Sequence, residues 1–109
     1  MKFSVQITAQ AETDLREIFE YIAFDLQAAE SAKGQRERLE SSILGLEHMP
    51  GRFHGFEAEP WRSRGLRVMP VDNYCVFYIP DKTQGVVTIL RIMYGGRDIE
   101  SQLSKLTDQ

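Results

Sequence analysis

The first part of the chain changes from alternating to helical spacing of its hydrophobic residues. Phe3, Val5 and Ile7 alternate with polar residues, the period of two expected of a strand with one buried face. After Thr8, which can cap a helix, apolar residues recur at helical spacing as far as Leu26. The pattern predicts a strand over residues 2–7, then an amphipathic helix of about four turns that ends at a break near residues 25–28.

A second helical pattern follows this break. Its repeat consists of Ala32, Arg36, Leu39, Ile43 and Leu46, and it stops before Pro50-Gly51. Two consecutive helices of this length indicate an antiparallel hairpin. Gly34 lies inside the second helix and costs roughly 1 kcal/mol relative to Ala, so we expect this helix to start late or to bend there.

The second half of the chain has the spacing of strands. Residues 52–61 show no periodicity and are predicted to form a loop. Strand patterns then cover residues 66–69, 74–79 and 86–93, with short connections that require antiparallel neighbours. Gly95-Gly96 ends the last strand, and Ile99, Leu103 and Leu106 could form one face of a short terminal helix.

The order of elements and the composition predict a single α+β domain over residues 1–109. A helix hairpin packed on one face of an antiparallel sheet is the layered arrangement that this order favours. Apolar residues make up 42% of the chain and charged residues 27%, which excludes the composition of a disordered protein. A length of 109 residues suits one hydrophobic core.

Charge and cysteine content restrict the possible partners and the compartment. The net charge is −3, so we expect no direct sequence-specific binding to nucleic acid. Residues 1–50 carry 5 basic and 9 acidic side chains, whereas residues 51–109 carry 8 and 7, so an anionic partner would meet the second half. The lone Cys75 and the lack of a long apolar segment favour a cytoplasmic protein that does not contact a membrane.

Four segments together resemble the RelE/ParE superfamily of toxins from type II toxin–antitoxin systems. They are residues 8–15, residues 46–51, residues 66–78 and the closing segment 89–99. The resemblance covers nearly the whole chain, and it implies the β, α, α, β, β, β topology that the patterns predict. It also implies a cognate antitoxin as partner.

The resemblance implies one of two activities. RelE-like members are ribosome-dependent ribonucleases that cut messenger RNA, whereas ParE-like members bind and block DNA gyrase. Cleavage by 2′-hydroxyl attack needs cations around the scissile phosphate. Here Cys75 stands where RelE-like toxins usually place an arginine, and Gly96 stands where they carry another cation. The chain is also acidic overall, so the sequence favours the ParE-like branch.

Arginines are the main candidates for contacts with the target or the antitoxin. Arg64, Arg67, Arg91 and Arg97 are the predicted binding residues, with Arg62 as a further cation of the same region. Arg91 is the first choice, because a charge inside an apolar strand is costly unless it is paired or serves a site. The alternative is that these arginines are solvated or are partners of nearby carboxylates such as Glu57, Glu59 and Asp98.

Other reactive side chains carry weaker signals. In the ribonuclease alternative, Arg91, Tyr94 and Arg97 would be the catalytic residues, but Tyr94 is more simply a tyrosine with a buried ring and a solvated hydroxyl. His48 and His54 lack a third ligand, so neither a metal nor a cofactor is expected. Cys75 is more typical of a small buried strand residue than of a nucleophile.

The sequence thus predicts a ParE-like toxin that inhibits growth by binding DNA gyrase, is not an enzyme and is neutralised by a cognate antitoxin. Two alternatives remain at this point. One is a RelE-like ribosome-dependent endoribonuclease, and the other is a toxin fold that has lost toxicity and only binds its antitoxin.

Overall fold

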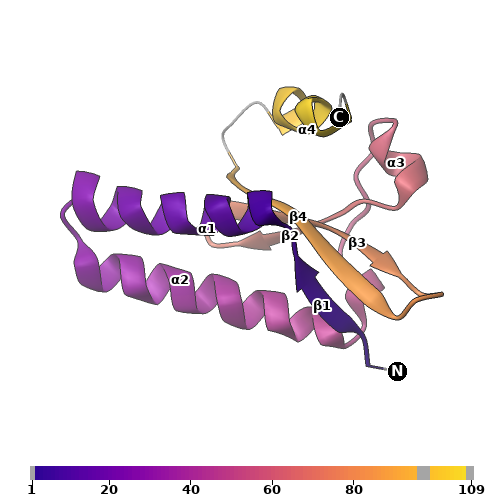
Figure 1. Ribbon diagram of the computed structural model, residues 1–109, viewed down its shortest axis with the longest axis horizontal. Helices are drawn as coiled ribbons and strands as arrows, with labels where there is room; N and C mark the ends of the chain where they lie inside the picture. Colours follow the sequence, from indigo (N-terminus) through magenta and orange to yellow (C-terminus); the bar gives the residue numbers. More distant parts are fainter. Residues whose placement is uncertain (1, 96–98, 108–109) are drawn as a thin grey trace.

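The computed structural model describes residues 2–95 and 99–107 and has the predicted α+β architecture (Figure 1). Its strands are β1 (Ser4–Ile7), β2 (Arg67–Val71), β3 (Tyr74–Asp81) and β4 (Val86–Tyr94). Its α-helices are α1 (Ala9–Glu20), α2 (Ala29–Leu44), α3 (Trp61–Arg64) and α4 (Ile99–Thr107). A π-helical turn, η1 (Tyr21–Asp25), extends α1, and two 3-10 turns, η2 (Gly45–Glu47) and η3 (Pro50–Arg52), follow α2.

The helix hairpin is confirmed. The Thr8 side chain caps α1 by accepting a hydrogen bond from the backbone N–H of Ala11. Figure 1 shows α1 and α2 side by side and extending beyond the sheet. Helix α2 begins at Ala29 and runs through Gly34, so the expected late start is not observed. Ala32, within its first turn, is fully buried, and this packing compensates for the low helix propensity of one glycine.

The sheet differs from the expectation in one respect. Its order is β1-β4-β3-β2, and β3 is antiparallel to both of its neighbours as predicted. Strand β1, however, pairs with β4 in parallel, from Ser4 beside Val86 to Ile7 beside Ile89. The expected all-antiparallel sheet is therefore wrong at this edge, because β1 and β4 are joined by a long crossover and not by a short turn.

A bulge interrupts the pairing of β3 with β4. Phe77 lies opposite Arg91 and Tyr78 lies opposite Ile89, which leaves Leu90 as an additional residue in β4. Alternation therefore changes phase: Ile89 and Ile92 join one hydrophobic cluster, and Leu90 packs against the other. Regular alternation along β4 predicts that Leu90 and Ile92 share one face and that Ile92 is in the core. The bulge places the two on different faces, and Ile92 is buried as this pattern predicts.

Both faces of the sheet are covered. The larger cluster joins the helix hairpin to the sheet through residues that include Leu39, Leu46 and Ile89. The smaller cluster on the other face contains Trp61, Leu66, Phe77, Met93 and Leu103. The predicted terminal helix is present as α4 and buries Leu103, while the side chain of Leu106 lies outside the described residues. Helix α3 is a short element that the loop prediction did not include.

No helix within residues 2–95 or 99–107 is both long enough and apolar enough to cross a membrane.

Candidate functional site

A buried ion pair connects helix α1 to strand β4. The Nε of Arg91 donates to Oδ2 of Asp14 at 2.7 Å, and its Nη2 donates to Oδ1 at 3.0 Å. The same carboxylate accepts the backbone N–H of Ile92 at 2.9 Å and the side-chain amide of Gln10 at 3.2 Å. Only 7% of each of Asp14 and Arg91 is exposed. Bidentate pairing with further donors is the arrangement that compensates the desolvation of two charges.

The pair lies where strand β1 ends and helix α1 begins. Pairing with β1 stops at Ile89, where the backbone N–H of Thr8 donates to the Ile89 carbonyl. The Thr8 hydroxyl then donates to the carbonyl of Leu90, the additional residue of the bulge. Asp14, six residues further along the chain, accepts the N–H of Ile92 in β4. The carboxylate therefore replaces the missing strand neighbour at this edge.

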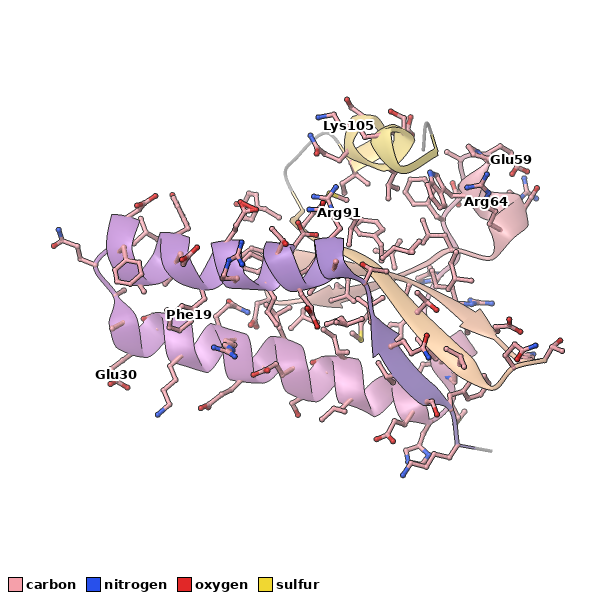
Figure 2. The ribbon with its side chains drawn as sticks, in the orientation of Figure 1. Phe19, Glu30, Glu59, Arg64, Arg91 and Lys105 are labelled. Atoms are coloured by element: carbon pink, nitrogen blue, oxygen red, sulfur yellow. The ribbon has the colours of Figure 1, made fainter. Side chains whose placement is uncertain are left out.

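This geometry bears on the two roles considered for Arg91, a contact with a partner or a structural ion pair. Figure 2 shows its side chain beside α1, and both of the bonds to Asp14 are internal. A guanidinium held in this way is not available to a partner or a phosphate unless the pair breaks. The observed pairing agrees with the structural role, in which Arg91 is the ion-pair partner of a carboxylate of the same chain.

Tyr94 ends β4 and is half exposed, beside a groove rich in aromatic side chains. Its ring meets that of Tyr74 edge to face, with 5.9 Å between the centroids. The groove runs under α1 and η1 and is lined by Asp14, Glu17, Ile18, Tyr21, Ile22, Leu26, Gln35, Asn73, Tyr74, Ile92, Met93 and Tyr94. None of these lining residues is basic. Burial, followed by the nearby Tyr21 and Tyr94, raises the pKa of Tyr74.

Cys75 has the properties of a packed strand residue. It is partly buried and packs against the smaller cluster, and this burial raises the pKa of its thiol. A thiol with a raised pKa is protonated at neutral pH and is a poor nucleophile. This supports the sequence-based interpretation of Cys75 and places no cation at this point of the sheet.

Of the remaining predicted arginines, those that the structure describes lie at the end of the sheet opposite to Tyr94. Arg64 is exposed on α3 and lies over the ring of Trp61 at 5.1 Å (Figure 2). Arg67, at the start of β2, donates to the carbonyl of Phe53. Arg62 and Arg67 line one shallow groove together, and Arg67 lines another with Arg52 and Lys82. Arg97 lies outside the described residues, so its role stays a prediction, as does that of Arg64 and Arg67.

The histidines do not form a metal site in the described part of the chain. His48 and His54 are both exposed, and residues 2–95 and 99–107 contain no group of histidine, cysteine, aspartate and glutamate side chains that could hold a metal.

Sequence reasoning missed Asp14, the partner of Arg91. As a charged residue, Asp14 is expected on the polar face of the first helix. However, it follows Ala11 by three residues and precedes Ile18 by four, which places it on the apolar stripe. A carboxylate on such a stripe is a signal for a buried partner. A second carboxylate, Asp72, was not singled out from the sequence either. It accepts hydrogen bonds from Gln35 and Arg38. The Arg38 hydrogen bond is the main cause of the lowered pKa of Asp72.

Comparison with solved structures identifies the class of fold. A chain of the chromosomal ParDE toxin–antitoxin system from P. aeruginosa aligns with a TM-score of 0.69 at 20% identity, over 85% of this chain and 96% of that chain. The RelBE2 toxin–antitoxin complex from Mycobacterium tuberculosis aligns with a TM-score of 0.60 at 20% identity, over 86% of this chain and 99% of that chain. A mutant E. coli RelE toxin in the free state aligns with a TM-score of 0.64 at 14% identity, over 96% of this chain and 97% of that chain. The fold is thus that of the RelE/ParE toxins.

A family model narrows this class. The model described as the ParE toxin of the type II toxin–antitoxin system, parDE, matches residues 5–99. The chain therefore belongs to the ParE toxin family and is a toxin of a type II toxin–antitoxin system. A search of curated proteins finds no match.

Proposed function

We propose that this toxin arrests growth by binding DNA gyrase and that it does not cut messenger RNA. The observation that carries the proposal is the lack of available cations around Tyr94 among the described residues. Arg91 is bound to Asp14, and the groove beside Tyr94 contains the carboxylates of Asp14 and Glu17 but no basic side chain. A phosphate undergoing 2′-hydroxyl attack would gain negative charge there without stabilisation by any cation among the groove residues that the structure describes.

The same toxin is proposed to be neutralised by a cognate antitoxin. The similar structures from P. aeruginosa and M. tuberculosis are a toxin–antitoxin system and complex by their descriptions. We expect the C-terminal segment of the antitoxin to lie on the apolar surface of the helices and sheet. Its acidic residues would pair with Arg64 and with Arg67, which lines one groove with Arg52 and Lys82 and another with Arg62 and the single carboxylate Glu57.

Primer extension on messenger RNA bound to translating ribosomes tests the first part of the proposal. We expect the purified toxin to leave the message intact at concentrations that arrest growth. Codon-specific cleavage that Tyr94→Phe abolishes would contradict the proposal and establish the ribonuclease alternative. Tyr94→Phe removes only a hydroxyl from a half-exposed ring, so the variant should fold normally.

Growth measurements distinguish a toxin from an inactive relic. Induction of this chain without an antitoxin should stop cell division, and coexpression of the antitoxin encoded beside it should restore growth. The antitoxin should also raise the melting temperature of the purified toxin, because a ligand that binds only the folded state stabilises it. Normal growth on induction, together with a melting-temperature shift by the antitoxin, would indicate the relic.

A further inference from the structure

The groove beside Tyr94 is a preformed concave surface at the end of the molecule opposite to the basic grooves. Its lining residues come from α1, η1 and α2 on one side and from the turn at Asn73 and the end of β4 on the other. Figure 1 shows that the helix hairpin extends past the sheet. The volume of the groove is about 780 Å³. Ile18, Tyr74 and Ile92 at the floor of the groove belong to or pack against the larger hydrophobic cluster, whereas η1 at its outer end has no buried residue.

Exposed aromatic and aliphatic side chains concentrate in this groove. Tyr21 and Tyr94 are each 52% exposed, and Leu26 is 55% exposed. Tyr74 lines the same groove and is in edge-to-face contact with Tyr94. Large apolar side chains left in contact with water at a concave site are typical of a surface that a partner covers.

Of the two carboxylates that line the groove, only Glu17 has no ion-pair partner among the described residues. Asp14 is saturated, since it accepts two bonds from Arg91, one from Ile92 and one from Gln10. Glu17 is exposed, and no cation of the described residues lies within ion-pair distance of it. By contrast, the neighbouring groove between α1 and α2 contains its own cations, Arg16 and Arg36, each paired with a carboxylate.

We propose that this groove docks a partner segment that inserts an arginine side chain flanked by apolar residues. The guanidinium would stack on the faces of Tyr21 and Tyr94 and pair with the carboxylate of Glu17. The apolar residues beside it would cover Ile22 and Leu26. Arginine fits better than lysine, because its planar group is weakly hydrated and stacks on aromatic rings. Glu17 would repel an acidic segment at this groove. The groove therefore selects a different partner segment from the basic grooves at the other end of the molecule.

The inference does not depend on gyrase as the target, because it concerns the chemistry of one surface of the folded toxin. The probe is a short blocked peptide in which one arginine lies between leucines, titrated into the intact ¹⁵N-labelled toxin and followed by NMR. Matched peptides carry citrulline, which has the shape of arginine without its charge, or glutamate at the same position. We expect saturable shifts at Glu17, Tyr21 and Tyr94 with the arginine peptide, weaker binding of the citrulline peptide and none of the glutamate peptide.

Substitutions localise the binding. Glu17→Gln should lower the affinity of the toxin for the arginine peptide by up to about fivefold, which corresponds to the free energy of an exposed ion pair. Glu12→Gln is the matched control, because Glu12 is an exposed carboxylate on the same helix that does not line this groove, and it should change nothing. Tyr94→Ala should lower the affinity for the arginine peptide and for the citrulline peptide by a similar factor.

Several results would overturn the proposal. They are equal affinity for the arginine and glutamate peptides, equal loss of affinity in Glu17→Gln and Glu12→Gln, or no saturable shift at the solubility limit of the peptide. Sedimentation of the unliganded toxin provides a separate check. A dimer that Tyr94→Ala dissociates would show that a second copy of the chain covers the groove, and the proposal would be wrong.

Discussion

The ion pair between Asp14 and Arg91 shows which properties of a single residue can be predicted from the sequence and which cannot. The cost of placing a charge inside an apolar strand identified Arg91 as a residue with a special role. The sequence could not identify its partner, because Asp14 lies on a different element and meets Arg91 only in the folded chain. The position of Asp14 on the apolar stripe of α1 is the one signal that could have shown it.

Removing one member of this pair should destabilise the fold. Arg91→Ala would leave the Asp14 carboxylate buried without its partner, and such changes cost about 3–5 kcal/mol in free energy of unfolding. Arg38→Ala is the matched control, because Arg38 makes the same type of bond to Asp72 on an exposed surface, where a pair contributes about 1 kcal/mol or less. Urea denaturation of both variants measures the difference. Arg91→Ala with unchanged stability and lost toxicity would instead assign Arg91 a direct contact with a partner.

Burial of Cys75 and Tyr78 predicts a loss of stability at alkaline pH. Burial raises the pKa of Cys75 above its ordinary value of 9.0 and that of Tyr78 above 10.0. A raised pKa in the folded state gives a contribution that is fully present below the unfolded pKa and is lost as the pH rises through the folded value. The free energy of unfolding should therefore fall from about pH 9 upwards.

Cys75→Ser separates the two groups. Serine does not titrate in this range, so the decline in this variant should begin near the unfolded pKa of tyrosine, about one pH unit later. Unfolding free energies measured across the alkaline range in both proteins test this, and an onset at the same pH in both would show that Cys75 does not contribute.

At the scale of elements, most helices and strands followed from periodicity, and the errors have a common cause. Strands β2 to β4 and the helix hairpin depend on local patterns of apolar residues, which the sequence displays. The bulge at Leu90 and the parallel pairing of β1 depend on contacts between distant segments. Thr8 shows the difference: its role as a cap was predicted, but its bond to the Leu90 carbonyl was not.

Thr8 should stabilise the junction between β1, α1 and β4 through both bonds of its hydroxyl. Thr8→Ala removes the cap and leaves the Leu90 carbonyl without this donor, so we expect a loss of about 1–2 kcal/mol in the free energy of unfolding. Thr8→Ser keeps the hydroxyl and should recover most of this loss. Chemical denaturation compares the two variants, and equal destabilisation by both would exclude the hydroxyl as the cause.

Helix α4 should be an integral part of the fold through Leu103. This residue is fully buried in the smaller cluster, so Leu103→Ala should cost about 2–5 kcal/mol in the free energy of unfolding. Lys105→Ala, on the exposed side of the same helix (Figure 2), is the control and should change stability little. A Leu103→Ala protein as stable as its control would show that α4 detaches from the sheet in solution.

At the scale of the whole molecule, sequence reasoning assigned the superfamily and the layered fold, and it assigned the site only in part. The candidate arginines were chosen from their positions along the chain. Of those that the structure describes, Arg91 is in a buried ion pair, and Arg64 and Arg67 lie at the other end of the molecule. The aromatic groove with Glu17 was not predicted, because its lining residues come from both helices, the turn at Asn73 and the end of β4. Such a surface exists only after the hairpin and the sheet have packed together.

The gyrase supercoiling assay tests the central claim most directly. Purified toxin added to gyrase holoenzyme, relaxed plasmid and ATP should inhibit supercoiling, and the antitoxin should restore it. Arg38→Ala, an exposed substitution on α2 outside the groove beside Tyr94, provides the folded control and should inhibit like the unmodified toxin. Complete supercoiling at saturating toxin, in a preparation that arrests growth when expressed, would contradict the claim that gyrase is the target.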